Sequence, residues 1–189
     1  MRKWKRVQTS SGVKLRATLD PHEVALLSNL VGSLCEMLDE RESSSPRDEL
    51  AEITGIKVGH SQAPDDDTMR RLLPDFHRPD EGEQADDSAN GALRSLHEPA
   101  IIDAKRQAAG RLLDTLPQGG GKLELTEADG HAWAAAVNDV RLALGTMLDV
   151  GPDGPEQLSQ DHPMAGHLEV YHWLTYVQEY LVLALMDAK

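Results

Sequence analysis

Apolar residues recur at helical spacing along a stretch in the second half of the chain. The positions, three and four residues apart, are Trp133, Val137, Val140, Leu144 and Met147. This spacing places all five on one face of an α-helix that begins at Thr126 and ends before Gly151-Pro152. Such a helix runs for about 35 Å, long enough to span a small domain. We therefore predict that it is central to the fold and that its apolar stripe belongs to the core.

The first half of the chain contains a second long helix with a clear start signal. Asp20-Pro21, with Glu23 three residues after the aspartate, is typical of a helix N-terminus. The helix is predicted to end near Arg41, and its apolar positions are Val24, Leu27, Val31, Leu34 and Leu38, widened by Leu26, Leu30 and Met37. Residues 46–76 are predicted to follow as short helical pieces, one over Pro46–Ile53 and one capped by Asp67.

Two further helices are predicted towards the C-terminus. A short helix over Ser88–Leu96 is interrupted at His97-Glu98-Pro99, and a new one continues to Leu116, because proline suits the first helical turn. The last helix begins at His162-Pro163 and runs to about Asp187. Its end, Leu181 to Met186, is apolar on every side, so we expect it to be buried within the domain or against a partner subunit.

Alternating residues predict strands before two of these helices. Lys3–Gln8 and Val13–Leu19 flank the turn-like residues 9–12, which indicates a β-hairpin anchored by Trp4 and Val7. Lys122–Leu125 predicts one more short strand. The order of strand, cap and helix thus occurs twice. It is either a weak internal duplication, with paired strands and helices packed side by side, or a chance likeness between amphipathic helices.

These elements predict a mainly α fold. We expect a helical bundle of about four longer helices, a small N-terminal β-hairpin and a third short strand, in a single domain over 1–189. Its parts are a basic hairpin (1–19), a first helical part (20–76), an acidic flexible linker (77–90) and a second helical part (91–189). The linker is assigned because apolar residues almost disappear there.

Charge and composition narrow the function. A net charge of -13 opposes general binding to nucleic acid or acidic membranes, and no helix-turn-helix with a basic recognition helix is evident. The longest apolar run is far shorter than the roughly 20 residues of a membrane span, and the N-terminus lacks the apolar region of a signal peptide. The single cysteine fits a reducing compartment. We therefore expect a cytoplasmic protein that binds neither DNA directly nor membranes.

The hairpin differs from this acidic background. Its basic residues are Arg2, Lys3, Lys5, Arg6, Lys14 and Arg16, and it contains no acidic residue. One interpretation is a patch that binds nucleic acid or the acidic surface of another protein. The other is a charged edge strand that prevents aggregation. Arg2, Lys3, Lys5 and Arg6 are therefore candidate partner contacts.

Few other residues suggest chemistry. His167 and His172 diverge on a helix, so they do not form the paired ligands of a zinc site, and no metal, cofactor or catalytic residue is assigned. Asn138, Asp139 and Arg141 flank the central stripe and form either a polar contact site, with Asn138 and Arg141 as candidate partner contacts, or surface ion pairs. Cys35 lies at the edge of an apolar face and is either a small buried hydrophobe or a redox-active thiol.

Several strings along the chain resemble one family. They are Arg41-Glu42-Ser43-Ser44-Ser45-Pro46 with Asp48-Glu49-Leu50, Arg70-Arg71-Leu72-Leu73-Pro74-Asp75-Phe76, Leu96-His97-Glu98-Pro99, Asn138-Asp139-Val140-Arg141-Leu142-Ala143-Leu144-Gly145, Tyr171-His172-Trp173-Leu174-Thr175 and the opening Met1-Arg2-Lys3-Trp4-Lys5-Arg6. Together they resemble the actinobacterial AosR-type oxidative-stress transcriptional regulators, formerly a family of unknown function. The resemblance covers nearly the whole chain apart from the acidic linker.

The resemblance implies a redox-responsive regulator of transcription that contacts RNA polymerase or a sigma factor. A thiol switch within the chain is excluded, because Cys35 has no second cysteine to pair with. Two other functions remain open from the residues alone. One is a helical scaffold that forms a homodimer through its last helix, and the other is an enzyme whose site is assembled from distant residues. We expect a non-enzymatic protein.

Overall fold

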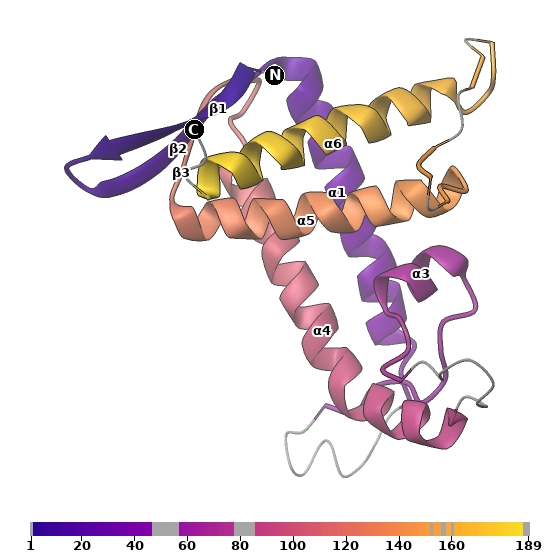
Figure 1. The fold of residues 1–189 in the computed structure, drawn as a ribbon. Coiled ribbons are helices and arrows are strands. Elements are labelled where there is room, and N and C mark those ends of the chain that lie inside the picture. The colour runs from indigo at the N-terminus through magenta and orange to yellow at the C-terminus, as the bar shows by residue number, and fades with distance from the viewer. Residues whose placement is uncertain are drawn as a thin grey trace.

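Four long helices form two pairs that cross. The computed structural model describes residues 2–46, 57–77, 86–151, 153–155, 158–159 and 161–186. Helix α1 (Pro21–Ser43) packs on α4 (Asp87–Thr115), and α5 (Glu127–Met147) packs on α6 (Ala165–Leu185) across them (Figure 1). The short helix α3 (Asp67–Leu72) packs on α5. The predicted mainly α bundle with four longer helices is confirmed.

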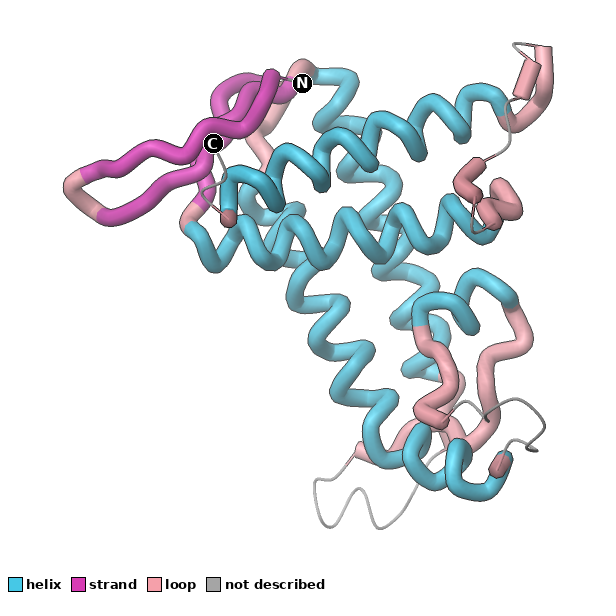
Figure 2. Tube along the Cα trace, in the orientation of Figure 1, coloured by secondary structure: helices cyan, strands magenta, loops and turns pink. Residues whose placement is uncertain are grey.

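A small antiparallel sheet lies at one end of this bundle (Figure 2). Its strands, β1 (Arg2–Thr9), β2 (Gly12–Leu19) and β3 (Gly121–Leu125), are ordered β1-β2-β3. The hairpin and the third strand are therefore confirmed. The strands of the suspected duplication, β2 and β3, do pair, but α1 and α5 cross instead of lying side by side, so that part of the hypothesis is wrong.

Both helices that follow a strand begin with the same local device. In α1, the Asp20 carboxylate accepts the Glu23 N–H and the Glu23 carboxylate accepts the Asp20 N–H, each at 2.9 Å. Thr126 and Asp129 exchange the equivalent bonds at the start of α5. Such capping boxes satisfy amide groups that would otherwise lack partners, which explains why the sequence located these starts well.

The core lies where the helix pairs cross and where the sheet meets α5. Its centre is the fully buried Trp133, whose indole N–H donates to Thr115 at 2.7 Å and whose ring packs edge-on against Trp4 of β1, with 5.7 Å between the ring centroids. Trp4 is thus the hairpin anchor that the sequence predicted, whereas Val7 is only partly buried.

Apolar residues at the ends of α5 and α6 that were predicted to be buried are exposed. Met147, the last residue of the α5 stripe, is 55% exposed, because the end of α5 borders a pocket instead of a packed helix. On α6, Leu181 is buried, but Val182, Leu183 and Met186 are exposed. Of the two places expected for this apolar end, the interior of the domain covers only part of it, and burial against a partner subunit stays a prediction.

Helix α4 passes through Pro99 without a break, so the predicted interruption is wrong. Proline has no N–H to donate to the carbonyl four residues earlier, that of Ser95. The Gly59 N–H donates to this carbonyl instead, at 2.8 Å. The helix also begins at Asp87, within the stretch predicted as linker, because Asp86 caps it by accepting the Ala89 N–H.

Other predicted segments are described only in part. Residues 78–85 of the linker and the Pro46–Ile53 piece from residue 47 lie outside the described residues. The piece around Asp67 is α3, and its cap is Asp66, which accepts the Met69 N–H at 2.8 Å.

The continuity of α4 depends on the glycine at position 59. A Cβ atom there would lie 2.9 Å from Cδ of Pro99. We expect Gly59→Ala to lower the free energy of unfolding by about 1–3 kcal/mol, because the backbone that satisfies Ser95 must move away. Thermal or urea unfolding measures this change. Gly32→Ala is the matched control: its Cβ meets nothing within 4 Å, so it should be neutral or stabilising. Equal stability of the two variants would contradict this role of Gly59.

Candidate functional site

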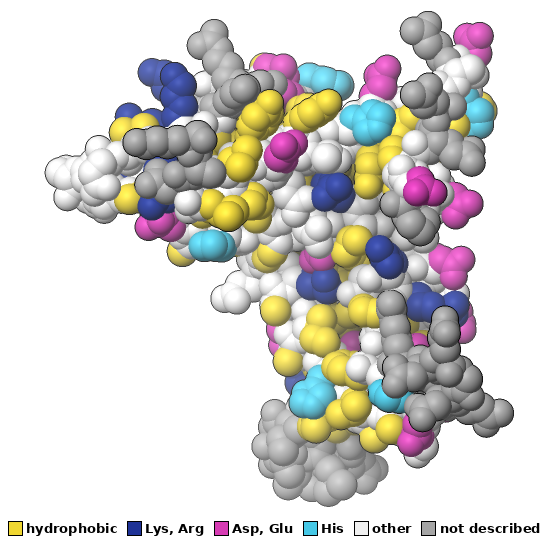
Figure 3. Space-filling view, in the orientation of Figure 1, with side chains coloured by type: hydrophobic (Ala, Val, Ile, Leu, Met, Phe, Trp, Pro, Cys, Tyr) yellow, Lys and Arg dark blue, Asp and Glu magenta, His cyan; other side chains and the backbone are white. Residues whose placement is uncertain are grey.

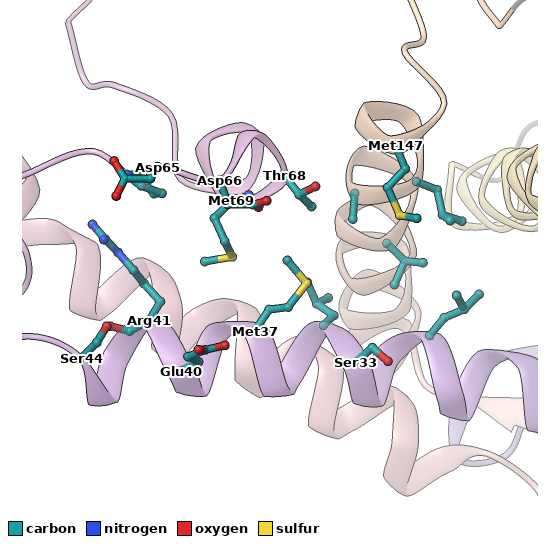
Figure 4. Close-up of a pocket in the computed structure, with 16 residues that line it drawn as sticks. Ser33, Met37, Glu40, Arg41, Ser44, Asp65, Asp66, Thr68, Met69 and Met147 are labelled. Carbon is teal, nitrogen blue, oxygen red and sulfur yellow. Dashed lines mark hydrogen bonds between the residues drawn. The ribbon is translucent and has the colours of Figure 1, made fainter. Parts of the chain in front are cut away.

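A pocket of about 570 Å³ lies between α1, α3 and α5 (Figure 4). Its walls are one face of α1 from Leu30 to Ser44, the C-terminal half of α5 from Val140 to Met147, and the segment from Pro64 to Met69. Most of the lining is apolar, while Arg41, Ser44 and Asp65 lie together at one end. The pocket can therefore hold an apolar group whose polar end faces Arg41 and Asp65.

A buried ion cluster holds the segment that forms the third wall. Arg94 and Glu98, one turn apart on α4, are each only 1% exposed. The Glu98 carboxylate accepts from Arg94 at 2.7 Å and from Arg41 at 2.8 Å. Arg94 also donates to Asp75 at 2.7 Å and to the Leu73 carbonyl at 3.0 Å. The cluster thus ties α1, α4 and the residues just after α3 into one unit.

This cluster joins three strings on which the family resemblance rests. Arg41, Asp75 and Glu98 come from separate strings and meet here. The sequence did not reveal this, although the spacing of Arg94 and Glu98, four residues apart on one helix, was a usable signal for an ion pair. The convergence of the other two residues depends on tertiary structure and has no local signal.

The predicted contact residues on α5 face α6. Arg141 donates to the Thr175 hydroxyl at 3.1 Å and to Gln178, and its guanidinium lies 5.3 Å from the centre of the Tyr171 ring. Asn138 accepts from the Gln178 side chain at 3.4 Å. These polar groups therefore bind within the chain and join α5 to α6.

The candidate residues of the hairpin differ in their exposure. Arg2 and Lys3 lie in β1, and their side chains are outside the described set. Arg6 binds Glu127 at 2.8 Å and donates to the carbonyls of Ala184 and Leu185 at the end of α6. Lys5 is exposed. The hairpin itself projects from the bundle, and Lys and Arg side chains gather near it (Figure 3).

Cys35 is half-buried beside the core. Burial raises the pKa of its thiol, Asp39 one turn away raises it further, and Arg106 opposes both effects. A raised pKa leaves less thiolate at neutral pH, and the thiolate is the form that reacts with oxidants. The redox role assigned to Cys35 remains a prediction, and its surroundings resemble those of a structural cysteine.

The described residues also bear on metals and membranes. Among them, no three His, Cys, Asp or Glu side chains are grouped as metal ligands would be. No described helix is long and apolar enough to cross a membrane.

Comparison with known proteins gives clear relatives. The family described as "Domain of unknown function (DUF2017)" matches residues 1–185. Proteins of Mycobacterium tuberculosis and Mycobacterium bovis named "Oxidative stress regulator AosR" are 61% identical over 196 residues, which cover all of this chain and 90% of each relative. A Mycobacterium leprae relative is 60% identical over 193 residues, 98% of this chain and 89% of its own length. No solved structure matches the chain significantly.

The pocket wall depends on the neutrality of the buried cluster. We expect Glu98→Gln to lower the free energy of unfolding by about 3–5 kcal/mol, because it leaves two arginines without their shared carboxylate. Glu124→Gln is the control: it removes an exposed pair with Arg16 and should cost at most about 1 kcal/mol. Urea unfolding gives both values. A cost for Glu98→Gln no larger than that for Glu124→Gln would show that the cluster does not stabilise the fold.

Proposed function

The chain belongs to the DUF2017 family, and on this basis we propose that it regulates transcription in the oxidative-stress response by protein contact with RNA polymerase or a sigma factor. The observation that carries the proposal is 61% identity, over the whole chain, to mycobacterial proteins named oxidative stress regulators. Those relatives are named as regulators, which favours a non-enzymatic role here as well.

Charge favours a protein partner over DNA. Duplex binding requires many phosphate contacts, and a net charge of -13 opposes the approach of a polyanion. A protein contact needs only one complementary patch, and electrostatic complementarity between patches speeds and orients such encounters. The basic hairpin supplies a patch of this kind.

Among the candidate partner contacts, solvent exposure of the side chains favours those of the hairpin. Lys5 points to solvent on a hairpin that extends beyond the bundle, whereas Arg6, Asn138 and Arg141 bind within the chain. We therefore propose that the exposed cations of β1 and β2 meet an acidic surface of the transcription machinery.

A capture experiment tests this contact. Immobilised protein, exposed to lysate of peroxide-treated cells of the source organism, should enrich RNA polymerase subunits or a sigma factor, identified by mass spectrometry. We expect Lys5→Glu to reduce the enrichment by about tenfold, because the charge reversal repels an acidic partner. Arg71→Glu, the same reversal on α3 away from the hairpin, should bind like the wild type. If the wild type enriches no polymerase or sigma component, the proposal is wrong.

A second candidate role, a homodimer or scaffold, is favoured by the outer face of α6. Tyr176, Leu183 and Met186 are 59%, 40% and 72% exposed, and their spacing places them on one side of the helix. Hydrophobic side chains gather over the C-terminal half of α6 in Figure 3. Exposed apolar side chains gathered on one side of a helix are a feature of protein interfaces. We propose that this face pairs with a second copy of the chain.

Light scattering at micromolar concentration tests the dimer. The wild type should have twice the mass of the chain, and Leu183→Glu should shift it to the monomer, because a charge would be buried in the interface. Leu93→Glu on α4 is the control, since Leu93 is 38% exposed and lies outside α6. A monomeric wild type would rule out the dimer under these conditions.

A further inference from the structure

Half of the methionines of this chain line one pocket. Met37 comes from α1, Met69 from α3 and Met147 from α5; Figure 4 shows Met37 and Met69 in the space between the helices and Met147 on its α5 side. The chain has six methionines in total. The pocket therefore has three thioether groups within its apolar lining, each from a different helix.

The three methionines differ in access to solvent. Met147 is 55% exposed at the rim, Met37 is partly buried, and Met69 is 7% exposed on the inner face of α3. A small oxidant that enters the pocket therefore meets Met147 first, Met37 next and Met69 last.

The thiol of Cys35 and the thioethers of the pocket methionines react with peroxide in different ways. A thiol reacts with peroxide as its thiolate, and the raised pKa of Cys35 keeps the thiolate scarce. A thioether needs no deprotonation: its sulfur lone pair attacks the peroxide O–O bond, an S=O bond forms, and water leaves. One oxygen atom is transferred, so that sulfur is oxidised by two electrons and peroxide is reduced to water.

We propose that this pocket is a methionine-oxidation site, at which peroxide converts Met147 and then Met37 to sulfoxides. Oxidation changes a flexible apolar side chain into a polar one and so makes the pocket lining polar. The site rests on the proposed function only for its biological use, as the point where an oxidative-stress regulator senses the oxidant.

The structural consequence falls on α3. This short helix contributes Met69 to the pocket and packs against α5, while the chain after it is held by Arg94 through Leu73 and Asp75. Polar sulfoxides at Met37 and Met147 weaken the apolar contacts of α3 and leave the buried ion cluster around Arg94 and Glu98 intact. Oxidation therefore loosens α3 and leaves α4 unchanged.

The experiment uses the purified full chain treated with hydrogen peroxide. Peptide mass spectrometry measures sulfoxide at each methionine, and hydrogen–deuterium exchange measures the opening of α3. Met186, 72% exposed and outside the pocket, is an internal reference for oxidant dose. We expect Met147 to be oxidised alongside Met186, Met37 later and Met69 last. Exchange in α3 should rise by about tenfold, because polar groups now lie in an apolar contact.

Leucine variants separate the pocket from other sulfur groups. In Met37→Leu/Met147→Leu, which keeps the volume and removes the sulfur, α3 exchange should not respond to peroxide. Met186→Leu and Cys35→Ser should respond like the wild type. The proposal is overturned if the double variant still responds, if Cys35→Ser abolishes the response, or if Met37 and Met147 stay unoxidised when Met186 is fully oxidised.

These readouts are independent of any transcription partner. A chain whose pocket oxidises as expected but which enriches no polymerase or sigma component would refute the proposed function and leave the oxidation site standing. A chain that enriches polymerase while its pocket methionines remain unoxidised would refute the oxidation site alone.

Discussion

The buried carboxylate of Glu98 is the constraint on which half of the molecule depends. A buried carboxylate is tolerated only when it has oppositely charged partners. The partners of Glu98 are Arg94, one turn earlier on α4, and Arg41 at the end of α1. Arg94 then needs Asp75 and the Leu73 carbonyl. Apolar packing alone would allow α1 and α4 to slide, whereas directed ion pairs set one register. The pocket exists because the segment from 57 to 77 is held at this register.

The other half is built around Trp133 and a close approach at Gly130. A Cβ atom at Gly130 would lie 2.6 Å from Cδ1 of Leu15 of β2 and 3.1 Å from Cδ2 of Leu185 of α6, so any larger residue would displace these two side chains. Arg6 adds hydrogen bonds to the last carbonyls of α6, where a cation is favoured by the helix dipole. The base of the hairpin is therefore joined to α5 and α6 by the contacts of Arg6.

These two halves separate the features with which a regulator could act. The basic hairpin and the apolar face of α6 belong to the sheet half, while the methionine pocket lies where α1 and α3 meet the end of α5. The sulfur groups also differ in their surroundings: the Cys35 thiol is half-buried beside the core, and the Met147 thioether is exposed to solvent. The sequence draws attention first to Cys35 as a redox-active residue. The proposed oxidation site lies instead at Met37 and Met147, which only the tertiary structure brings to one pocket.

Local patterns determined the elements of this protein. Helices α1, α5 and α6, the caps at Asp20 and Thr126 and the three strands follow from periodicity and from hydrogen bonds between residues close in the chain, which the sequence displays directly. Only the tertiary structure decided the rest. Pro99 remains inside a helix because Gly59, forty residues earlier, satisfies the carbonyl that proline cannot. The packing of α6 against α5 gives Arg141 its hydrogen-bond partner, and the arrangement of α1 and α3 beside the end of α5 places Met147 at a pocket. Such contacts join residues far apart in the chain, so no local spacing encodes them.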